Sequence, residues 1–377
     1  MPAADAAARV AIVLPPREDF SPSATGALGL LVHRLASWPG GFSQTVLGVA
    51  QAAPFADVDF RPVRPSWFPG SFNRRYARGA ARVLRALGPC LIEVHNRPDL
   101  ALFLARNFRA VPVALFLNND PQGMRGARSA ADRGRLLARL ALVATSSDFL
   151  AGRLAEGVDR PVRPPVVVAN WLDLREVPPS PAARSDVILF AGRVVRDKGA
   201  DSFVRACALA LPRLPGWRAE MIGADRFGPD SPETAFLRDL RPQAAAAGVV
   251  MQGYRPHPQV MAAMAEASIV VVPSRWDEPF GLTALEAMAA GAALLCAPRG
   301  GLPEVFGDAG VAIDPDDPAA MAEAMVALAG DPMRRAALAA AGRARARGFD
   351  LPVAAARIGA LRRQVIADGS EPAGRPI

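Results

Sequence analysis

Two carboxylates, Glu278 and Glu286, lie eight positions apart in the segment RWDEPFGLTALEAMAAG, which is otherwise mostly apolar and small. The preceding run SIVVVPS is typical of a buried strand, RWDEP of a turn, and LTALEAMAAG of a helix that ends at Gly291. Glu278 therefore precedes the helix, whereas Glu286 lies roughly 6 to 8 Å further along its axis. The two carboxylates are too far apart for a tightly coupled acid–base pair, but they can bind two parts of one elongated ligand.

The backbone at the start of this helix is the second part of the candidate site. Phe280, Gly281 and Leu282 lie at the predicted N-terminus, where the first amides of a helix have no partner inside it. Glycine at position 281 lets a ligand approach the backbone closely. The alternatives are a capping role for Glu278 and a solvated position for Glu286, although the apolar neighbours of Glu286 argue against the second.

Two cations follow another predicted strand, in VILFAGRVVRDKGAD. Arg193 and Lys198 lie five positions apart in a loop that also holds Gly192 and Gly199 and that precedes a helix. Cations beside free amides at a helix start suit a diphosphate. Lys198 is the only lysine of the chain, which indicates that this position requires a compact ammonium and not a planar guanidinium. The alternative is surface charge on a connecting loop.

Polar residues also follow predicted strands in the first half. His95 closes LIEVHN, and Asn118 follows VPVALFL together with Asn119 and Asp120, whose short side chains can bind sugar hydroxyls. The segment PPREDFSPSATGALGLL places Gly26 in a turn-rich loop at the start of a helix, where we expect it to cover the ligand. This loop lacks both G-x-G-x-x-G and the Walker lysine, so it is similar to a phosphate-binding loop only in outline.

The elements that must position these residues form a repeating pattern. Apolar runs such as RVAIVLPP, CLIEVHN, VPVALFL and VVVAN alternate with segments of helical period, which is typical of a parallel sheet with helices on both faces. After the proline-rich stretch REVPPSPAARSD the pattern begins again with VILFAG, AEMIGA, VVMQGY, SIVVVPS and ALLCAP. Helices are expected in the first half at Gly26–Trp38, Asp99–Phe108 and Asp132–Leu142.

The pattern predicts an α/β protein with two doubly wound, Rossmann-like domains that face each other across a cleft. We expect an N-terminal, acceptor-binding domain over residues 1–175 and a C-terminal domain over residues 176–352. The remaining segment, 353–377, contains a helix that returns towards the N-terminal domain. Ligands bind at the carboxyl ends of strands in such sheets, and the candidate residues follow strands in both halves.

Composition limits the class of protein. With 51% hydrophobic and 21% charged residues the chain is globular and not disordered. Cys90, Cys207 and Cys296 lack metal-ligand spacing and indicate reduced core thiols. The first residues lack the basic start of a secretory signal, and no apolar run approaches the roughly 20 residues that span a bilayer. We therefore expect a cytoplasmic protein that is soluble or peripheral on the inner membrane.

The excess of positive charge lies in the first half. Residues 1–176 hold 22 basic and 14 acidic side chains, whereas residues 177–377 hold 22 of each. Trp67 and Phe68 precede a predicted basic amphipathic helix with four arginines on one face: Arg74, Arg78, Arg82 and Arg85. Such a helix suits an anionic membrane surface, and the alternative is an ordinary surface helix packed on the sheet. The arginines lack a recognition-helix or aromatic-platform context, so no nucleic-acid partner is expected.

The second half resembles the retaining glycosyltransferases of family 4, which have the GT-B fold. The resemblance rests on GRVVRDKG, MIGA, VVMQGY, VVPSRWDEPFGLTALEAMAAG and RGGLPEV in this order, over residues 187–330. The first half is similar more loosely, through LIEVH, ATSSDFL and VVVANWLDL.

The resemblance implies a role for most of the candidate residues. Arg193 and Lys198 would hold the diphosphate of a UDP- or GDP-linked sugar, and Glu286 would bind the ribose hydroxyls. Glu278 would hold the donor sugar together with the amides of residues 280–282. Gly192 would lie at the diphosphate, and Gly253 and Tyr254 would border the base. The resemblance implies no metal and no other cofactor.

The implied mechanism is departure of the nucleoside diphosphate with attack of the acceptor on the same face, which retains the anomeric configuration. Many relatives carry a histidine after the strand that corresponds to VPVALFL, and here the matching position is Asn118. Either Asn118 takes that role by hydrogen bonding or His95 substitutes for it. Both are therefore candidate catalytic residues beside Glu278, Arg193 and Lys198.

The main hypothesis is a hexosyltransferase with a glycan or glycolipid acceptor, acting in bacterial polysaccharide, lipopolysaccharide or glycolipid synthesis at the inner face of a membrane. One alternative is a nucleotide-sugar epimerase of the same fold, and another is a non-catalytic nucleotide-sugar-binding scaffold. A dinucleotide dehydrogenase is disfavoured because G-x-G-x-x-G is missing.

Overall fold

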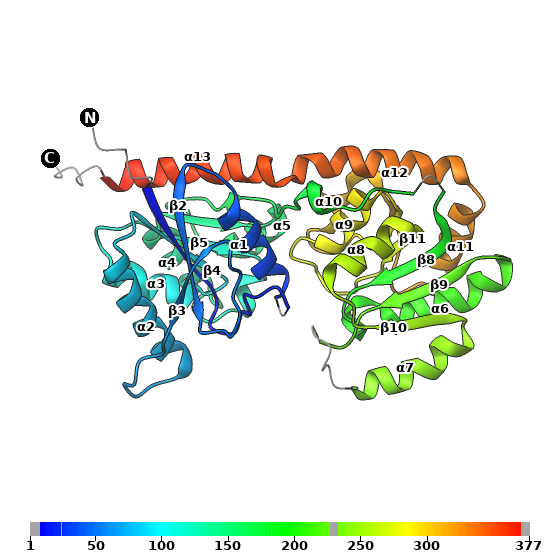
Figure 1. Ribbon diagram of the computed structural model, residues 1–377, viewed down its shortest axis with the longest axis horizontal. Helices are drawn as coiled ribbons and strands as arrows, with labels where there is room; N and C mark the ends of the chain where they lie inside the picture. Colours follow the sequence, from blue (N-terminus) through cyan, green and yellow to red (C-terminus); the bar gives the residue numbers. More distant parts are fainter. Residues whose placement is uncertain (1–7, 24, 182, 227–232, 371–377) are drawn as a thin grey trace. The chain divides into compact units, whose positions relative to one another are not determined.

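The computed structural model describes residues 8–23, 25–181, 183–226 and 233–370. The chain forms two compact units: unit 1 comprises Met1–Asn170 and Leu351–Ile377, and unit 2 comprises Trp171–Asp350. The predicted boundaries, after residues 175 and 352, lie a few residues further along the chain. Each unit contains one wholly parallel sheet, so the predicted pair of doubly wound α/β domains is confirmed (Figure 1).

Unit 1 contains a seven-stranded sheet in the order β3-β2-β1-β4-β5-β6-β7. Every residue of β4 and β5 is buried, as expected for central strands with helices on both faces. The strands are β1 (Ala8–Val13), β2 (Phe42–Val49), β3 (Asp59–Val63), β4 (Leu91–His95), β5 (Val113–Leu117), β6 (Leu142–Thr145) and β7 (Val166–Val167). The sequence reading missed β2, β3 and β6, and it placed the start of β6 in a helix.

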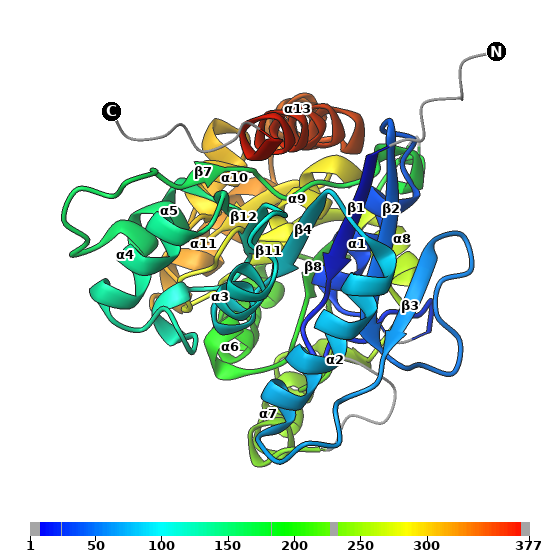
Figure 2. The same cartoon turned by 90° about the vertical axis from the view of Figure 1, so that its left-hand side faces the viewer.

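The helices of unit 1 lie on both faces of its sheet. Figures 1 and 2 show α13 on the opposite side of the strands from α2 and α3. The helices are α1 (Ala27–Ser37), α2 (Phe72–Leu87), α3 (Pro98–Asn107), α4 (Ala130–Arg139), α5 (Asp148–Ala155) and α13 (Leu351–Ser370), with a short 3-10 helix η1 (Pro121–Gly123).

The C-terminal helix α13 belongs to unit 1 because it packs against β4 and α1. Its buried residues recur at helical spacing, at Leu351, Ala354, Ile358, Arg362 and Val365. The Arg362 guanidinium is 4% exposed and donates to both carboxylate oxygens of Glu93 on β4, each over 2.8 Å. The prediction that the last helix returns to the first domain is therefore confirmed.

Unit 2 contains a six-stranded sheet in the order β10-β9-β8-β11-β12-β13. The inner strands are uninterrupted runs of buried residues, as the apolar runs of the sequence predicted. The strands are β8 (Ser185–Ala191), β9 (Arg218–Ile222), β10 (Val249–Gly253), β11 (Ala267–Val272), β12 (Ala293–Cys296) and β13 (Val311–Ala312).

The helices of unit 2 alternate with these strands along the chain. They are α6 (Ala200–Ala210), α7 (Ala235–Ala246), α8 (His257–Glu266), α9 (Leu282–Ala290), α10 (Leu302–Phe306), α11 (Pro318–Ala329) and α12 (Pro332–Ala346). Short 3-10 helices lie at η2 (Leu174–Glu176), η3 (Arg196–Lys198), η4 (Leu211–Arg213), η5 (Gly307–Ala309) and η6 (Arg347–Phe349). Cys207 and Cys296 are buried free thiols of this core, as predicted, and burial raises the pKa of both.

Strand order decides which loops meet. Strands β8 and β11 are neighbours, with Val271 paired to Phe190. The segment after β8 contains Arg193 and Lys198, and the segment after β11 contains Glu278. Because parallel strands end at the same edge of a sheet, residues about 80 positions apart in the chain are brought together there.

Candidate functional site

Lys198 and Glu278 form an ion pair at the shared end of β8 and β11. The Lys198 Nζ atom lies 2.5 Å from Glu278 Oε1, and the Ser274 hydroxyl donates to the same oxygen over 2.8 Å. Glu278 is only 7% exposed, so its charge is balanced by the ammonium and not by water. Ser274 was not singled out in the sequence, because a serine that ends an apolar strand is a weak signal by itself.

The solitary lysine lies between two kinds of group. Besides the Glu278 carboxylate, its Nζ atom is 4.8 Å from the centre of the Trp276 ring, within the range of a cation–π interaction. The Lys198 side chain is 21% exposed, so the ammonium still reaches solvent. A compact ammonium with three donors can serve the carboxylate and a bound anion together, which gives a physical reason for lysine at this position.

Arg275 joins the turn after β11 to the loop after β8. Its guanidinium donates to Asp201 over 2.6 Å and to Asp316 over 2.8 Å. The amides of Arg275 and Trp276 both donate to the carbonyl of Asp197, over 2.8 and 3.1 Å. Hydrogen bonding to Asp201 raises the pKa of Arg275; burial alone would raise the pKa of Asp201, but the contacts with Arg275 lower it. The two loops therefore form one hydrogen-bonded body that holds Lys198 beside Glu278.

Gly300 lies directly against the backbone of Glu278. A Cβ atom at position 300 would lie 2.3 Å from the Glu278 carbonyl oxygen, and the backbone has φ of +60° there. The next amide, of Gly301, donates to that same carbonyl over 2.7 Å. The glycine pair in RGGLPEV thus allows the close approach that holds Glu278 in place.

The helix after Glu278 starts at the predicted position. Its glycine, Gly281, was expected to let a ligand approach, and the structure gives another reason for it. Gly281 is the N-cap of α9 with φ of +106°, and a Cβ atom there would lie 2.3 Å from Leu302. Glycine is therefore required by the backbone itself. Among the described residues, none accepts a hydrogen bond from the amides of Phe280, Gly281 or Leu282, so these donors remain available to a ligand.

Glu286 has a partner that sequence reasoning did not find. His257, the first residue of α8, places Nε2 2.7 Å from Glu286 Oε1. The side chains are 30% and 13% exposed respectively. The contact depends on the packing of α8 against α9, which no local signal in RPHPQ reveals.

The remaining predicted donor residues lie at the ends of β8 and β10. Arg193 is half-buried, and its side chain has no hydrogen bond or ion pair within the described part of the chain. The Gly192 amide donates to Ile222 at the end of β9, and the Gly253 carbonyl accepts from Gly223 over 2.9 Å. Gly253 and the half-buried Tyr254 therefore lie one strand beyond β9, along the same sheet edge as Arg193.

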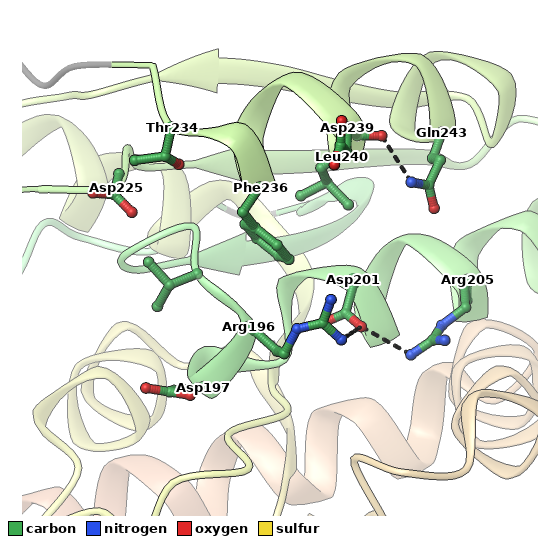
Figure 3. Close-up of a pocket in the computed structure, with 11 residues that line it drawn as sticks. Arg196, Asp197, Asp201, Arg205, Asp225, Thr234, Phe236, Asp239, Leu240 and Gln243 are labelled. Carbon is green, nitrogen blue, oxygen red and sulfur yellow. Dashed lines mark hydrogen bonds and ion pairs between the residues drawn. The ribbon is translucent and has the colours of Figure 1, made fainter.

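A pocket of about 650 Å³ opens beside the same loop of unit 2 (Figure 3). Its lining includes Arg196 and Asp197 from η3, and Phe236 and Asp239 from α7. Arg196 lies over the Phe236 ring at 5.8 Å and reaches Asp201 at 3.9 Å, so its charge is already partnered. None of the predicted donor residues lines this pocket, and we assign it no role.

His95 lies at the predicted strand end, but its side chain is buried. It is the last residue of β4, yet it is 3% exposed and stacks on Phe116 with ring centres 5.1 Å apart. Neither ring nitrogen has a hydrogen-bond partner among the described residues. Burial lowers the pKa of His95 to about 4, so the imidazole is neutral at pH 7. A catalytic role of His95 stays a prediction.

Asn118 is half-buried at the end of β5 and is held by its backbone. Its amide donates to the side-chain oxygen of Asn96 over 2.7 Å, and Asn96 itself has φ of +50°. Its side chain is not used in this bond. Asp120, by contrast, pairs with Arg153 at 2.9 Å and caps η1, so it has a structural partner where we had considered a sugar-binding role.

Gly26 is the N-cap of α1, and the helix start already contacts an anion of the chain. The Glu18 carboxylate accepts from the Gly29 amide over 3.1 Å, and a Cβ atom on Gly26 would lie 3.2 Å from it. Burial raises the pKa of Glu18, although the bond from Gly29 acts against this shift. Part of the predicted loop, residue 24, lies outside the described residues. A contact of Gly26 with a ligand stays a prediction.

Metal sites and membrane-spanning helices are both absent from the described residues. No group of three or more histidine, cysteine, aspartate or glutamate side chains is arranged to hold a metal ion there. In the same part of the chain, none of the helices combines the length and the apolar character that crossing a membrane requires.

Comparison with known proteins places the second half of the chain in a family. A family model described as glycosyl transferases group 1 matches residues 176–345, all within unit 2. The chain is 38% identical over 196 residues to D-inositol 3-phosphate glycosyltransferase 1 of Catenulispora acidiphila, covering 50% of this chain and 46% of that protein. It is 32% identical over 277 residues to D-inositol 3-phosphate glycosyltransferase of Frankia alni, covering 67% and 68%. The chain thus spans about half the length of the Catenulispora relative.

The fold is also similar to that of solved structures. The Anabaena protein HepE, crystallised in complex with UDP, superposes with a TM-score of 0.76 at 18% identity, covering 94% of this chain and 100% of that one. The same protein in complex with UDP-glucose gives a TM-score of 0.73 at 18% identity, covering 94% and 99%. At this identity the likeness concerns the fold alone.

Proposed function

The chain belongs to the glycosyl transferases of group 1, and on this premise we propose that it transfers a hexosyl group from a nucleotide-sugar donor with retention of the anomeric configuration. The observation that carries the proposal is the Lys198–Glu278 ion pair at the strand ends of unit 2. Its carboxylate is buried, its ammonium reaches solvent, and it lies near helix amides that can bind a ligand, an arrangement that suits a diphosphate and a sugar.

The donor residues take separate parts of one ligand in this proposal. Arg193 and Lys198 hold the diphosphate, and Glu278 with the amides of residues 280–282 binds the sugar. Glu286 binds the ribose hydroxyls with its second carboxylate oxygen while His257 occupies the first. Gly192 lies beside the diphosphate, and Gly253 and Tyr254 border the base. UDP-linked sugars are the first donors to examine, because HepE binds UDP and UDP-glucose.

Leaving-group stabilisation is the main catalytic contribution that these residues can make. Negative charge grows on the diphosphate as its bond to the sugar breaks, and the Lys198 ammonium, now shared between Glu278 and the diphosphate, together with Arg193 offsets that charge. The acceptor hydroxyl attacks from the same face, and its proton passes to the departing diphosphate. No side-chain nucleophile and no metal enter this scheme.

We propose that the acceptor is a glycan or a lipid-linked sugar of the bacterial cell surface and that unit 1 binds it, at a membrane that the chain contacts peripherally from the cytoplasm. Asn118 is the candidate for positioning the donor sugar from unit 1, because its side chain is half-buried while that of His95 is enclosed. The names of the similar relatives give inositol 3-phosphate as a further acceptor to examine.

Thermal unfolding with a panel of nucleotide sugars and free nucleoside diphosphates tests the donor site. A ligand that binds only the folded state raises the apparent stability. The nucleotides that carry one particular base should therefore raise the melting temperature of the protein. We expect Lys198→Ala to abolish this shift. Arg196→Ala is the matched control, because Arg196 lies two positions away on η3 and pairs with Asp201 instead of Glu278. Loss of the shift in both variants would contradict a specific role for Lys198.

Transfer is tested by incubating the stabilising donor with lipid-linked sugars, oligosaccharides and inositol 3-phosphate, followed by determination of the anomeric configuration of the product. An inverted product would contradict the proposed mechanism. Conversion of the donor sugar without any acceptor would identify an epimerase. Donor binding with neither reaction, together with full cellular function of Glu278→Gln, would identify a scaffold.

A further inference from the structure

Three aromatic side chains are exposed to solvent at one end of α2. Trp67 is 77% exposed, Phe68 52% and Phe72 42%. Together with Trp276 they are the four aromatic residues among the exposed large apolar side chains of the described residues. Apolar surface gathered in this way is unfavourable in water and marks an interaction site more often than single exposed residues do.

The exposure of these rings is built into the loop that carries them. The Ser66 amide donates to the Arg75 carbonyl over 2.9 Å, and Arg75 Nε donates back to the Ser66 carbonyl over 2.6 Å. Arg78 donates to the Pro69 carbonyl over 3.2 Å. Residues 66–69 are thus fastened to α2, and the Trp67 and Phe68 rings stack with centres 4.3 Å apart. The aromatic pair is presented in a fixed conformation on the outside of unit 1.

The charge around this loop has one sign. Residues 60–92 contain seven arginines and no aspartate or glutamate. Arg74, Arg78 and Arg82 are exposed at successive intervals of four positions, so they form a row on one face of α2 with steps of roughly 6 Å. Arg78 lies over the Phe68 ring at 5.9 Å, whereas Arg85 lies over the Phe108 ring at 5.7 Å. Arg85 lies at the opposite end of the helix from the aromatic residues.

We propose that the aromatic–arginine surface, defined as Trp67, Phe68, Phe72, Arg74, Arg78 and Arg82, docks on the headgroup layer of an anionic membrane. A straight row of cations beside rigid aromatic rings fits a flat anionic layer with an apolar interior. The rings enter the interfacial region, where tryptophan is favoured, and each arginine is attracted to the anionic headgroups. The other half of the α2 face, with Tyr76, Ala77, Ala80 and Leu84, is packed in the core of unit 1. Docking therefore requires no unfolding of the helix.

This inference rests on the proposed function only for its biological purpose, which is access to a lipid-linked acceptor. The contact itself follows from exposure and charge. Donor binding is measured without vesicles, and vesicle binding is measured without a donor, so the two proposals can fail separately.

Sedimentation with lipid vesicles tests the docking surface. The full chain is mixed with vesicles of phosphatidylcholine alone or with vesicles that also contain about 30% of the anionic lipid phosphatidylglycerol. Binding to each is measured at low and at high salt. At low salt we expect the chain to bind the anionic vesicles at least roughly tenfold more strongly than vesicles of phosphatidylcholine alone. High salt should reduce this difference, because the Debye length is already only about 10 Å at 0.1 M and shortens as the salt concentration rises. Trp67→Ser with Phe68→Ser should lower the affinity roughly tenfold, and Arg74→Gln with Arg78→Gln should remove most of the salt dependence.

Controls of the same chemistry come from unit 2. Met333 is 80% exposed and Arg334 is exposed beside it, so Met333→Ser and Arg334→Gln remove similar groups from another surface. These variants should bind vesicles as the unchanged chain does. An unchanged melting temperature of each variant without any ligand verifies that the fold is intact.

Several results would overturn the inference. They are no vesicle binding at low salt, equal binding to vesicles without anionic lipid, or an equal loss of binding in the unit 2 controls. Trp67-dependent self-association in sedimentation velocity would identify a second copy of the chain as the occupant. Tighter binding of single-stranded nucleic acid than of vesicles would identify a polyanion instead.

Discussion

The Lys198–Glu278 pair shows how one residue of the site depends on another that is distant in sequence. Glu278 is almost fully buried, and a buried carboxylate without a partner is costly. The ammonium of Lys198 and the hydroxyl of Ser274 both donate to it. Because the Lys198 ammonium also reaches solvent, it can donate to a bound diphosphate while it remains paired with Glu278.

His257 is predicted to orient Glu286 and not to touch the reacting atoms. Replacing His257 with Ala removes the 2.7 Å contact and frees the carboxylate to rotate, which costs the donor about 1 kcal/mol of binding. Steady-state kinetics should therefore show a KM for the donor that rises roughly fivefold while kcat changes little.

Two further variants make the His257 prediction specific. His257→Gln keeps a donor in reach of Glu286 and should restore most of the affinity. His33→Ala removes a similar histidine–carboxylate contact, with Asp57 in unit 1, and should leave the KM unchanged. A fall in kcat with an unchanged KM would show that His257 acts in the chemical step.

His95 is predicted to make stability depend on pH. Its pKa of about 4 in the folded protein lies below the roughly 6.5 of an unfolded chain, so below pH 6.5 the unfolded state binds the proton more readily. The contribution of the neutral His95 to the free energy of unfolding is thus fully present above about pH 6.5, and it is lost as the pH falls from there towards 4. Between pH 7.5 and 5.0 the free energy of unfolding should fall by about 2 kcal/mol, because the last roughly 1.5 pH units lie below the pKa of the unfolded chain and each costs about 1.4 kcal/mol.

Urea unfolding of the unchanged chain and of His95→Phe at these two pH values measures this contribution. Phenylalanine keeps the stack on Phe116 and has no titratable group. All other titrating groups are common to both proteins and cancel in the comparison. Equal pH dependence in the two proteins would show that His95 is accessible to protons in the folded state.

At the scale of elements, the site is the meeting of two loops and a helix start. The β8–α6 loop contributes Lys198, the β11–α9 turn contributes Glu278, and Arg275 joins the two through Asp201. Neither loop has regular structure of its own over most of its length. Their conformation is maintained by hydrogen bonds to each other and by glycines that permit close backbone contact.

Gly300→Ala is predicted to displace Glu278. The added Cβ atom would lie 2.3 Å from the Glu278 carbonyl oxygen, and φ of +60° disfavours alanine by about 1–2 kcal/mol. We expect a lower melting temperature and at least a roughly tenfold weaker affinity for the nucleotide sugar, both measurable by thermal unfolding with increasing donor concentration.

Gly348→Ala provides the matched control for that substitution, because a Cβ atom there meets nothing within 4 Å. It should change neither the melting temperature nor the donor affinity appreciably. Full donor affinity in Gly300→Ala would show that the position of Glu278 does not depend on the glycine pair.

At the scale of the whole molecule, unit 1 is built from two ends of the chain. Residues 351–370 belong to it, although they follow all of unit 2 along the chain. The buried Arg362–Glu93 pair joins positions 269 residues apart, and Gln44 of β2 accepts from the same guanidinium over 2.8 Å. The last helix is therefore part of the first domain's core, so its loss should destabilise unit 1.

Arg362→Met is predicted to destabilise the protein by about 3–5 kcal/mol, because it leaves the Glu93 carboxylate buried and unpaired. Adding Glu93→Gln should recover a large part of this loss, since the uncompensated charge is then gone. Urea unfolding of both variants measures the difference. Arg363→Met, an exposed neighbour, is the control and should have almost no effect. A small effect of Arg362→Met would show that α13 is held by its apolar residues alone.

The sequence by itself determined the fold class, most strands, the return of the last helix, the start of α9 and the family. It could do so because buried parallel strands are continuous apolar runs and because helix starts and ends have local signals. It missed the edge strand β3 and its neighbour β2, which carry polar residues such as Asp59 and Gln44, and it placed the first residue of β6 in a helix.

Only the tertiary structure decided which side chains meet and which are enclosed. Strand order made neighbours of β8 and β11 and so paired Lys198 with Glu278, while the packing of α8 on α9 gave Glu286 its partner His257. His95 is likewise buried and stacks on Phe116, which its place at a strand end did not reveal. Burial and long-range contact are properties of the assembled sheet and its helices, and no short segment of sequence contains them.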